Sequence, residues 1–552
     1  MKRSKTWLSG IMALCMMAMM LTGCGGTGGR DKQTIPEKDT NVTEPGELPI
    51  VKEKITLTVG VPGSAKVEDY DTNAMTKFLE EKTNIDLEFY QFPSSGGMEK
   101  LNVMLASNTE LPDVIVGFNI PKTTFLTYAS EGVFVELSEY FDKYGYWSKN
   151  FKENTQVQNL EGYMSVADGG KYFMPNVAEQ LGNMYGGKAF INKVWLDKLG
   201  LDMPETIDDF TKIMQAFITQ DPNGNGKNDE IGFTGSKGGW NEKPVNFLMN
   251  SFIYDDYKDG FVAEDGKLSL NYTTDEYKEG LAYLKDMAAE KLLDVQAYTQ
   301  DNNTLRSLIA SKMVGAFATG SPDNLFLDDP AYMSEFVALP PLKGPNGIAY
   351  TLRSEPTPNC GGVITKYCEH PEAAFRFLEY FLSEEVSMFS RYGVEGVDWK
   401  PATADMKAMF GDYGFEAKIQ QILPYGSIQN SHWNQAGPSF RSSAISDTLA
   451  WDGNPADGEY FKAVALKAYI NKGPEEIFNT NKMLLSLEEM TEYNDLYTSI
   501  SRCVKEHIPS FITGEKNLDA DWQEFQKALQ NLDVDRYLEL AQKGYDAFRE
   551  VK

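Results

Sequence analysis

The sequence predicts an α/β protein made of two units, the first of them a parallel sheet covered by helices. Strand-like and helix-like segments alternate from Ile55 onward, and this alternation is typical of a parallel sheet with helical crossovers. A second alternation of the same kind opens near residue 188. The chain has 552 residues, more than one hydrophobic core usually organises, so its length predicts two or three lobes.

The first unit is expected to follow a β-α-β-α-β order. Its first segment, ITLTVGVP, alternates apolar and polar residues and ends at Pro-Gly, as a half-buried strand does. The next segment places Met75, Phe78 and Leu79 at helical spacing. Strands are expected at residues 55–62, 85–93 and 112–118, and helices at residues 73–84 and 98–108.

The second unit opens with the strand-like segment KAFIN and continues into an amphipathic helix. Thr206 can cap this helix, because Asp209 stands at the capping-box position. One apolar face is expected from Ile207, Phe210, Ile213, Met214, Phe217 and Ile218. Further strands are expected at residues 312–320 and 361–366, and helices at residues 370–385 and from residue 519 onward.

The N-terminus has the features of an export signal. Basic residues precede an uncharged apolar run that is short for a membrane span. The run ends in LTGC, which resembles the lipobox of bacterial lipoproteins, where Cys24 receives the lipid and becomes the mature N-terminus. An ordinary cleaved signal with a chance cysteine is the alternative. We expect a signal peptide at residues 1–23 and a flexible tether, rich in Gly, Thr and Pro, at residues 24–50.

The charge balance disfavours nucleic acid and anionic membrane surfaces as partners. The formal net charge is −28, and it becomes −31 once the basic signal is removed. Beyond the signal and Cys24 only three cysteines remain, and an odd number argues against a disulfide framework. A Cys360–Cys368 bond and unpaired buried cysteines both stay open.

The strongest chemical signal is the loop DPNGNGKNDE, residues 221–230. Oxygen-bearing side chains alternate along it and its sixth position is glycine, as in an EF-hand-type calcium loop. The glutamate that an EF-hand needs at position 12 is replaced by Gly232, and the segment that follows is not helical. The loop therefore predicts a structural Ca²⁺ site rather than a sensor, with an Asn-Gly turn as the alternative. The expected ligands are Asp221, Asn223, Asn225, Lys227 through its backbone carbonyl, Asp229 and Glu230.

No sequence pattern positively indicates catalysis. The three histidines are not at metal-ligand spacing, and the motifs H-E-x-x-H and G-x-S-x-G do not occur. A pair of carboxylates facing one glycosidic bond cannot be recognised from spacing. We therefore expect a protein that is not an enzyme, and an extracellular polysaccharide hydrolase or lyase is the alternative.

Longer segments resemble a known family. Residues 192–235, which include the calcium-type loop, are similar to the family 1 extracellular solute-binding proteins of carbohydrate ABC transporters. Within this family the chain resembles the large lipoprotein branch with a short calcium loop, as in alginate-oligosaccharide-binding proteins. Residues 357–385, 391–399 and 511–548 are similar to the same branch.

The resemblance implies a two-lobed periplasmic-binding-protein-like α/β fold, with the ligand cleft between lobes joined by crossing strands. By this likeness lobe one takes residues 51–180 and 347–398, and lobe two takes residues 181–346 and 399–552. It also implies a monomer, lipid-anchored at the extracellular face of the bacterial cell membrane, that delivers an oligosaccharide to ABC transporter permease subunits. Lobe closure would capture the ligand without chemistry. A peptide-binding lipoprotein of the same fold is an alternative.

Sugar binding suits the aromatic content of the chain. Pyranose faces pack on aromatic rings, and sugar hydroxyls need planar polar partners. Arg353 and Arg441 are candidates for contact with a carboxylate if the ligand is a uronide, and surface ion pairs are the alternative. The candidate platforms are the tryptophans in Gly- or Asn-rich, loop-like contexts, each of which could instead be a core residue: Trp240, Trp399, Trp433 and Trp451.

Overall fold

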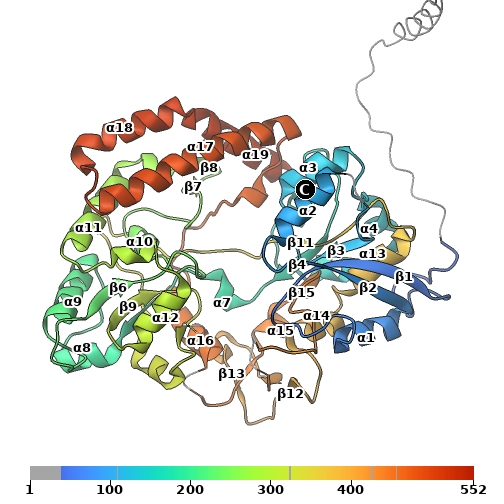
Figure 1. The fold of residues 1–552 in the computed structure, drawn as a ribbon, viewed down its shortest axis with the longest axis horizontal. Helices are drawn as coiled ribbons and strands as arrows, with labels where there is room; N and C mark the ends of the chain where they lie inside the picture. Colours follow the sequence, from blue (N-terminus) through green and yellow to red (C-terminus); the bar gives the residue numbers. More distant parts are fainter. Residues whose placement is uncertain (1–38, 108–109, 323–324, 424–426, 455–456, 552) are drawn as a thin grey trace, which may run out of the picture. The chain divides into compact units, whose positions relative to one another are not determined.

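The computed structural model describes residues 39–551, apart from the internal segments 108–109, 323–324, 424–426 and 455–456. The expected signal peptide, Cys24 and most of the expected tether therefore lie outside the described residues. Two separate sheets organise the described chain, and each is covered by helices (Figure 1). This arrangement agrees with the two α/β units that the sequence predicts.

The first sheet has six strands in the order β15-β4-β11-β3-β1-β2. β1 pairs parallel with β2 and β3, and β15 pairs parallel with β4, whereas β11 runs antiparallel to both of its neighbours. The predicted β-α-β-α-β order at its start is confirmed. The strands are β1 (Ile55–Pro62), β2 (Ile85–Phe92), β3 (Val114–Val116), β4 (Met174–Ala178), β11 (Asn359–Ile364) and β15 (Ser439–Arg441).

Helices from two parts of the chain surround this sheet, which we call the sheet of lobe one. The segment between β10 and β11 brings the chain back to it, and the next two helices pack beside β11 and β15. The helices are α1 (Ala74–Thr83), α2 (Gly97–Ala106), α3 (Lys122–Ser130), α4 (Ser138–Tyr144), α5 (Trp147–Asn154), α6 (Leu160–Met164), α13 (Pro371–Tyr380) and α14 (Glu384–Tyr392).

The second sheet, that of lobe two, has four strands in the order β10-β5-β9-β6. β6 pairs parallel with β9, whereas β5 runs antiparallel to β9 and to β10. Every residue of β5 and β9 is buried, which places the core of lobe two along these central strands. The strands are β5 (Ala189–Asn192), β6 (Ile231–Thr234), β9 (Val314–Ala318) and β10 (Phe336–Leu339).

Helices also cover the second sheet. α9 begins as predicted, because Thr206 and Asp209 form a capping box and the predicted apolar face is buried, with Ile218 half-buried at its end. Four helices of this lobe contact strands of the sheet: α8 (Lys193–Leu199), α9 (Ile207–Thr219), α10 (Pro244–Met249) and α16 (Gly458–Tyr469). α11 (Asp275–Ala289) packs on α10. The lobe also contains α12 (Asn302–Ala310) and the hairpin of β7 (Phe261–Glu264) and β8 (Lys267–Leu270).

The reversed strands show how the two sheets meet. β4 ends at the carboxyl edge of the first sheet, and residues 179–188, which include α7 (Leu181–Met184), lead directly into β5 of the second. Because β5 is antiparallel to its neighbours, it enters the second sheet at the edge where β6 and β9 end. The return crossing from β10 into the reversed strand β11 repeats this pattern. The carboxyl edges of both sheets therefore lie at the crossings, where open α/β sheets bind ligands.

A helical layer at the C-terminus contacts both lobes. α17 (Leu487–Ile512) packs against α11 in lobe two and against α3 in lobe one. Lys122 of α3 donates hydrogen bonds to the carbonyl of Asn481 at 2.9 Å and of Gly162 at 3.1 Å. The layer is completed by α18 (Leu518–Asn531) and α19 (Val534–Glu550) (Figure 1). α17 was not anticipated from the sequence.

Two segments lie where the sequence analysis did not expect them. Residues 39–50, which were expected in the tether, pack onto lobe one. The fully buried Arg376 donates hydrogen bonds to the carbonyls of Thr43 at 3.0 Å and Glu47 at 3.2 Å. Residues 439–441 were expected in lobe two, but as β15 they pair with β4. We propose that lobe one includes both segments.

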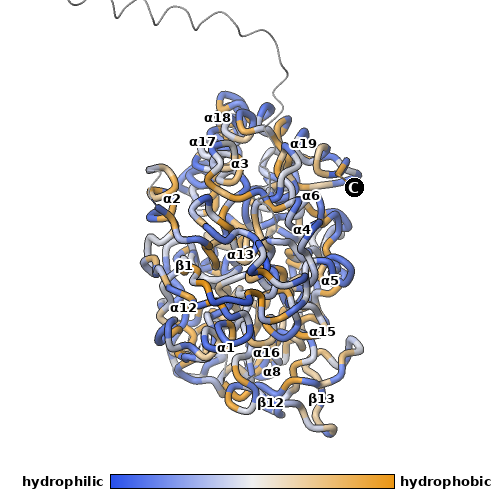
Figure 2. The backbone as a smooth tube through the Cα atoms, turned by 90° about the vertical axis from the view of Figure 1, so that its right-hand side faces the viewer, coloured by the Kyte–Doolittle hydropathy of each residue, from blue (hydrophilic) through white to orange (hydrophobic). Residues whose placement is uncertain are grey.

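Hydrophobic and hydrophilic residues alternate along the backbone (Figure 2). Within the described part of the chain, no helix is long and apolar enough to cross a membrane. The cysteines Cys360, Cys368 and Cys503 are buried and free, so the alternative of unpaired buried cysteines holds in this structure.

Candidate functional site

The carboxyl edge of the second sheet carries a half-exposed tryptophan. The loop after β6 folds back across the end of β9, because the amide of Gly320 donates to the carbonyl of Trp240 at 2.7 Å. The amide of Ser236 donates to the carbonyl of Glu242 at 2.8 Å and closes the base of the loop. Trp240 is 47% exposed, so the loop presents its indole at the edge that faces the crossings.

Glycines hold the Trp240 ring in place. A Cβ atom at Gly320 would lie 2.5 Å from the ring, and one at Gly186 would lie 3.2 Å from it. The ring therefore packs closely against backbone of the strand end and of the crossing segment. The Lys188 ammonium lies 5.9 Å from the ring centroid, within cation–π range. A ring fixed in this way is a rigid platform for an apolar face.

The base of this loop is a buried polar network. The Glu242 carboxylate accepts hydrogen bonds from the hydroxyl of Ser236 and from the amide of Asn302 at 2.7 Å. Burial raises the pKa of Glu242. Burial also lowers the pKa of Lys188 to about 7, although its ammonium donates to the carbonyl of Gly182 at 3.0 Å. The hydrogen bonds of Glu242 fix the conformation of the loop, and Glu242 and Lys188 are both buried.

The corresponding edge of the first sheet is lined by residues 432–436. The amide of Asn434 donates to the Ser64 hydroxyl at 3.4 Å, just beyond the end of β1. A Cβ atom at Gly117, just beyond β3, would lie 2.7 Å from Ala436. Asn434 and Gln435 have positive φ angles of 50° and 64°. Two adjacent strained residues are held here only by their surroundings, as at many binding sites.

Trp433, predicted as a ligand platform, is instead the buried anchor of this loop. It is fully buried, its ring packs edge-on against Phe89 at 5.2 Å, and its indole N–H donates to the Thr76 hydroxyl at 2.8 Å. The ring therefore lies in the core of lobe one. Its two neighbours, Asn434 and Gln435, are half-buried and carry planar amides of the kind that bind sugar hydroxyls.

The other two predicted tryptophans are half-buried and lie apart from Trp240. Trp399 donates its indole N–H to the carbonyl of Gly393 at 3.1 Å and packs on a hydrophobic cluster around Tyr392. Trp451 stacks on Tyr460 with the ring centroids 4.0 Å apart, so one of its faces is covered. No hydrogen bond or ring contact found in the structure joins either residue to the Trp240 loop.

The predicted arginines are tied to protein groups. Arg353 donates from one guanidinium nitrogen to the carbonyls of Pro474 at 2.6 Å and Glu475 at 2.8 Å. It therefore fastens the second crossing to the segment that leads into the C-terminal helices. Arg441 lies at the end of β15 and is half-buried.

The predicted calcium loop is folded by its own side chains. The Asp221 carboxylate accepts from the amides of Asn225 and Gly226, each at 3.0 Å. The Asn225 side chain accepts from the Lys227 amide at 2.8 Å and donates to Asp229 at 2.9 Å. Asp221 and the two loop glycines have positive φ angles. The oxygen-bearing side chains are thereby gathered around one turn.

Glu230 is the residue of this loop that lacks a partner. Both carboxylate oxygens are buried, and within the described residues neither has a hydrogen bond of ordinary geometry. Burial raises the pKa of Glu230, and the carboxylates of Asp221 and Asp229 raise it further. A buried carboxylate without a partner is costly, and a bound cation would satisfy it. The donor set, carboxylate and amide oxygens, is the one that Ca²⁺ prefers.

The described residues contain no group of three or more His, Cys, Asp or Glu side chains already gathered as metal ligands. Calcium sites also use amide and backbone carbonyl oxygens, and this loop has both kinds. The number of gathered carboxylates therefore does not by itself decide whether the loop can hold Ca²⁺.

Comparison with known families now decides the class of protein. The bacterial extracellular solute-binding protein family matches residues 64–388, which is more than half of the chain. The chain belongs to this family. The match spans all four strands of the second sheet, both crossings and the calcium-type loop. The predicted resemblance to extracellular solute-binding proteins and the predicted two-lobed α/β fold are thereby confirmed.

Two curated relatives are similar over most of the chain. The fructooligosaccharide ABC transporter substrate-binding protein FusA of Streptococcus pneumoniae serotype 4 (strain ATCC BAA-334 / TIGR4) is 24% identical over 568 aligned residues, which cover 99% of each chain. The lipoprotein LipO of Bacillus subtilis (strain 168) is 26% identical and covers 70% of this chain and 73% of its own.

Solved structures share the fold. FusA in complex with kestose has a TM-score of 0.74 and 22% identity, covering 90% of this chain and 100% of the other. Alginate-binding protein AlgQ2, solved without calcium ion, has a TM-score of 0.68 and 20% identity, covering 90% and 99%. A second FusA structure is of an EF-hand mutant. Proteins of this fold thus include one that is described as having an EF-hand and one that was solved without calcium ion.

Proposed function

We propose that this solute-binding protein captures an oligosaccharide between its lobes and delivers it to the permease subunits of an ABC importer. The observation that carries the proposal is the fixed, 47% exposed Trp240 ring at the carboxyl edge of the second sheet. The amides of Asn434 and Gln435 lie at the corresponding edge of the first sheet. The aromatic ring on lobe two can pack on the apolar face of a sugar, and the planar amides on lobe one can bind its hydroxyl groups.

The relatives support a carbohydrate rather than a peptide. FusA is named for fructooligosaccharides, and a third relative, YtcQ of Bacillus subtilis, is named for polygalacturonan and rhamnogalacturonan. We infer that the chain binds its sugar without cleaving it, because these relatives are binding proteins.

Calorimetric titration with a panel of oligosaccharides tests this function. A fructan series, a galacturonide series and a peptide library should be titrated in parallel, and the sugar should be recovered and sized afterwards. We expect saturable binding of one sugar class at one site per chain and full recovery of intact ligand. Shortened sugar would favour the hydrolase or lyase, and binding of peptides alone would favour the peptide-binding lipoprotein.

We also propose that the 221–230 loop holds a structural Ca²⁺ ion. Asp221, Asn223, Asn225 and Asp229 would supply side-chain oxygens, Lys227 its carbonyl, and Glu230 the carboxylate that otherwise has no partner. The ion would neutralise three neighbouring carboxylates and fix the turn between α9 and β6. The loop directly precedes β6, and it is the opposite end of β6 that lies at the crossings. We therefore assign the loop a stabilising role rather than a ligand contact.

We further propose that Cys24 anchors the protein, as a monomer, to the extracellular face of the cell membrane. The similarity to a protein named as a lipoprotein supports this, together with the lipobox-like LTGC. Replacing Cys24 with Ala should release the protein or leave it as uncleaved precursor, which membrane fractionation and mass spectrometry would show. Unchanged anchoring of the variant would contradict the proposal.

A further inference from the structure

Lobe two contains a cavity of about 590 Å³ between α11 and α17. The cavity is distinct from the exposed face of Trp240, although Lys237 and Lys243, on either side of the Trp240 loop, both line it. Protein interiors are close-packed and rarely leave voids larger than a water molecule. Small-molecule sites, by contrast, have volumes of roughly 300–1,000 Å³. The size of this cavity is that of a binding site.

Apolar side chains of two helices line much of the cavity. α11 contributes Tyr277, Leu281 and Leu284, which are buried. α17 contributes Ile500, Val504 and Ile508 at helical i, i+4 spacing, and the last two are only half-buried. The two helices pack against each other, and the cavity lies beside that contact. These apolar side chains leave room for a ligand with an apolar body.

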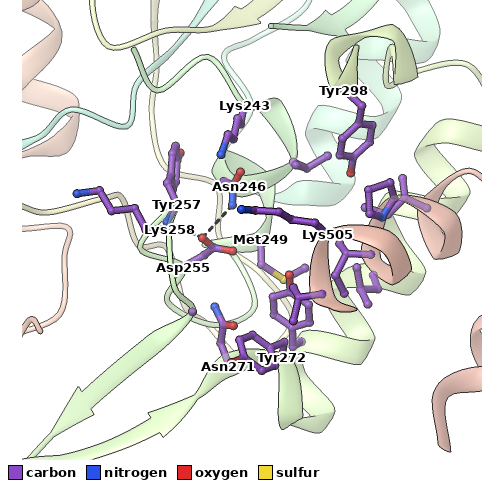
Figure 3. Close-up of a pocket in the computed structure, with 18 of the residues that line it drawn as sticks. Lys243, Asn246, Met249, Asp255, Tyr257, Lys258, Asn271, Tyr272, Tyr298 and Lys505 are labelled. Atoms are coloured by element: carbon purple, nitrogen blue, oxygen red, sulfur yellow. Dashed lines mark hydrogen bonds between the residues drawn. The ribbon is translucent and has the colours of Figure 1, made fainter. Parts of the chain in front are cut away.

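One end of the cavity is polar and rich in hydrogen-bond donors (Figure 3). The Lys505 side chain reaches from α17 across the cavity toward Asn246 and Asp255, and Lys243 lies above the same end. Among the described residues, no acidic side chain forms an ion pair with Lys243 or Lys505. Asp255 and Asp259 also line the cavity and interact electrostatically with Lys243 and Lys505, respectively, without direct contact. Two ammonium groups are therefore available at this end to bind an anion.

The Tyr298 hydroxyl points toward the same space (Figure 3). It is inaccessible to bulk solvent and has no hydrogen-bond partner among the described residues. It can donate a hydrogen bond to a ligand, and it gains a partner only if something enters the cavity.

The acidic residues at this end offer only limited opposition to an anion. Burial, together with the neighbouring Asp256 carboxylate, raises the pKa of Asp255 to about 7. Burial likewise raises the pKa of Asp259 to about 6. Asp255 also accepts hydrogen bonds from the Asn246 amide at 2.9 Å and the Tyr257 backbone amide at 2.7 Å. Near neutral pH a substantial fraction of Asp255 is uncharged.

We propose that this cavity binds a small organic carboxylate with an apolar body, whose carboxylate is held by Lys243 and Lys505 and whose body lies between α11 and α17. The site is separate from the oligosaccharide site. A sugar fits it poorly, because the helix stripes offer few partners for hydroxyl groups. An uncharged apolar ligand would leave the two lysines and Tyr298 without partners.

The test is calorimetric titration of the full chain with 3-phenylpropanoate and with its uncharged counterpart 3-phenylpropanamide. We expect saturable binding of the acid at one site per chain and at least about tenfold weaker binding of the amide, since hydrogen bonds to charged groups are the stronger ones. Equal affinities, or no saturable binding of the acid, would overturn the proposal.

Variants locate the site. Lys505→Met removes the ammonium but keeps the length of the side chain, and it should weaken binding of the acid about tenfold. Lys258→Met is the matched control, because Lys258 lines the rim while its amine points away from the cavity (Figure 3), and it should leave the affinity unchanged. Ile508→Trp should place an indole ring in the apolar part of the cavity and weaken binding about tenfold or more.

Circular dichroism and melting curves establish that each variant is folded. If Ile508→Trp fails to fold, Tyr298→Phe, which removes only the hydroxyl, replaces it and should weaken binding severalfold. Binding that survives both cavity changes would contradict the proposal, as would competition between the acid and a bound oligosaccharide. The acid is titrated in the absence of sugar. The test of this cavity therefore gives its result even if the chain binds no oligosaccharide.

Discussion

At the scale of single residues, the orientation of Trp240 matters more than its residue type. Gly186 and Gly320 lie against the ring and leave no room for a Cβ atom, and the polar network beneath Glu242 fixes the backbone. A ring that is already ordered loses little entropy when a ligand stacks on it. The same residue type is a core anchor at Trp433, because there the indole N–H has a buried hydroxyl as its partner.

Replacing Trp240 with Ala should lower oligosaccharide affinity by about tenfold or more, because stacking and apolar burial are lost together. Titration calorimetry on the folded variant measures the change. Trp147→Phe is the control, since Trp147 packs on Tyr380 in lobe one, and it should bind as the natural chain does. An unchanged affinity for Trp240→Ala would remove this residue from the site.

Asp447 is a second residue whose environment sets its behaviour. Its carboxylate accepts from the Leu181 amide at 3.2 Å, at the first crossing between the lobes. Burial, together with the carboxylates of Glu459 and Glu179, raises its pKa to about 7. Between the ordinary Asp pKa near 4 and about 7, the folded protein therefore binds more protons here than the unfolded chain. This residue makes stability fall as pH rises through that window.

Replacing Asp447 with Asn should remove this dependence, because the amide oxygen still accepts from Leu181 and carries no charge. The melting temperature of Asp447→Asn minus that of the natural chain should increase between pH 5 and pH 8. Asp519→Asn, at a side chain that is 87% exposed, should show no such trend. A difference that stays constant with pH, or decreases, would contradict the sign of the argument.

At the scale of elements, the 221–230 loop illustrates how a short segment can be stabilised by a ligand. It joins α9 to β6, so its conformation sets where the amphipathic helix ends and the edge strand begins. A ligand that binds only the folded loop stabilises the whole lobe by mass action, about 2.7 kcal/mol at a hundredfold excess over its dissociation constant. Extracellular calcium would keep a weak site filled.

Chelation should therefore lower the melting temperature, and added Ca²⁺ should restore it. Asp221→Ala should abolish the response, whereas Asp202→Ala, at an exposed acid outside the loop, should keep it. Differential scanning calorimetry measures all four conditions. A melting curve that ignores the chelator would remove the calcium site, and a large loss of sugar affinity in the folded, chelated protein would make the loop part of the binding site.

Elements were more predictable than sites. Periodicity and caps located β1, α1, β2 and α9 within a few residues, because these signals are local. They did not reveal β15, whose partner β4 is more than two hundred and fifty residues away. The sequence named Trp240 and Trp433 alike as candidates and could not tell the exposed ring from the buried one, since burial depends on long-range packing. It did not single out Asn434 and Gln435, which we now propose for the site, because their positive φ angles have no sequence signal.

At the scale of the whole molecule, the topology brings the Trp240 loop and residues 432–436, the two surfaces proposed to hold the sugar, to the same crossings. The chain leaves each sheet at its carboxyl edge and enters the other sheet at that sheet's carboxyl edge. β5 and β11, the strands that follow the two crossings, are therefore antiparallel to their neighbours. Hinge residues at such crossings can absorb a rotation of one lobe against the other. The helical layer of α17 contacts both lobes, and any closure must therefore also change its packing on α3 or on α11.

Lobe closure around an oligosaccharide is the central claim, and a distance between the lobes tests it most directly. Spin labels can be placed at Val103→Cys on α2 and Asn303→Cys on α12, both exposed, because Cys360, Cys368 and Cys503 are buried. Pulsed dipolar spectroscopy should show the distance distribution shift and narrow when the sugar identified by calorimetry is added, and Trp240→Ala should need about ten times more sugar. A distribution that does not change at saturating sugar would contradict capture by closure.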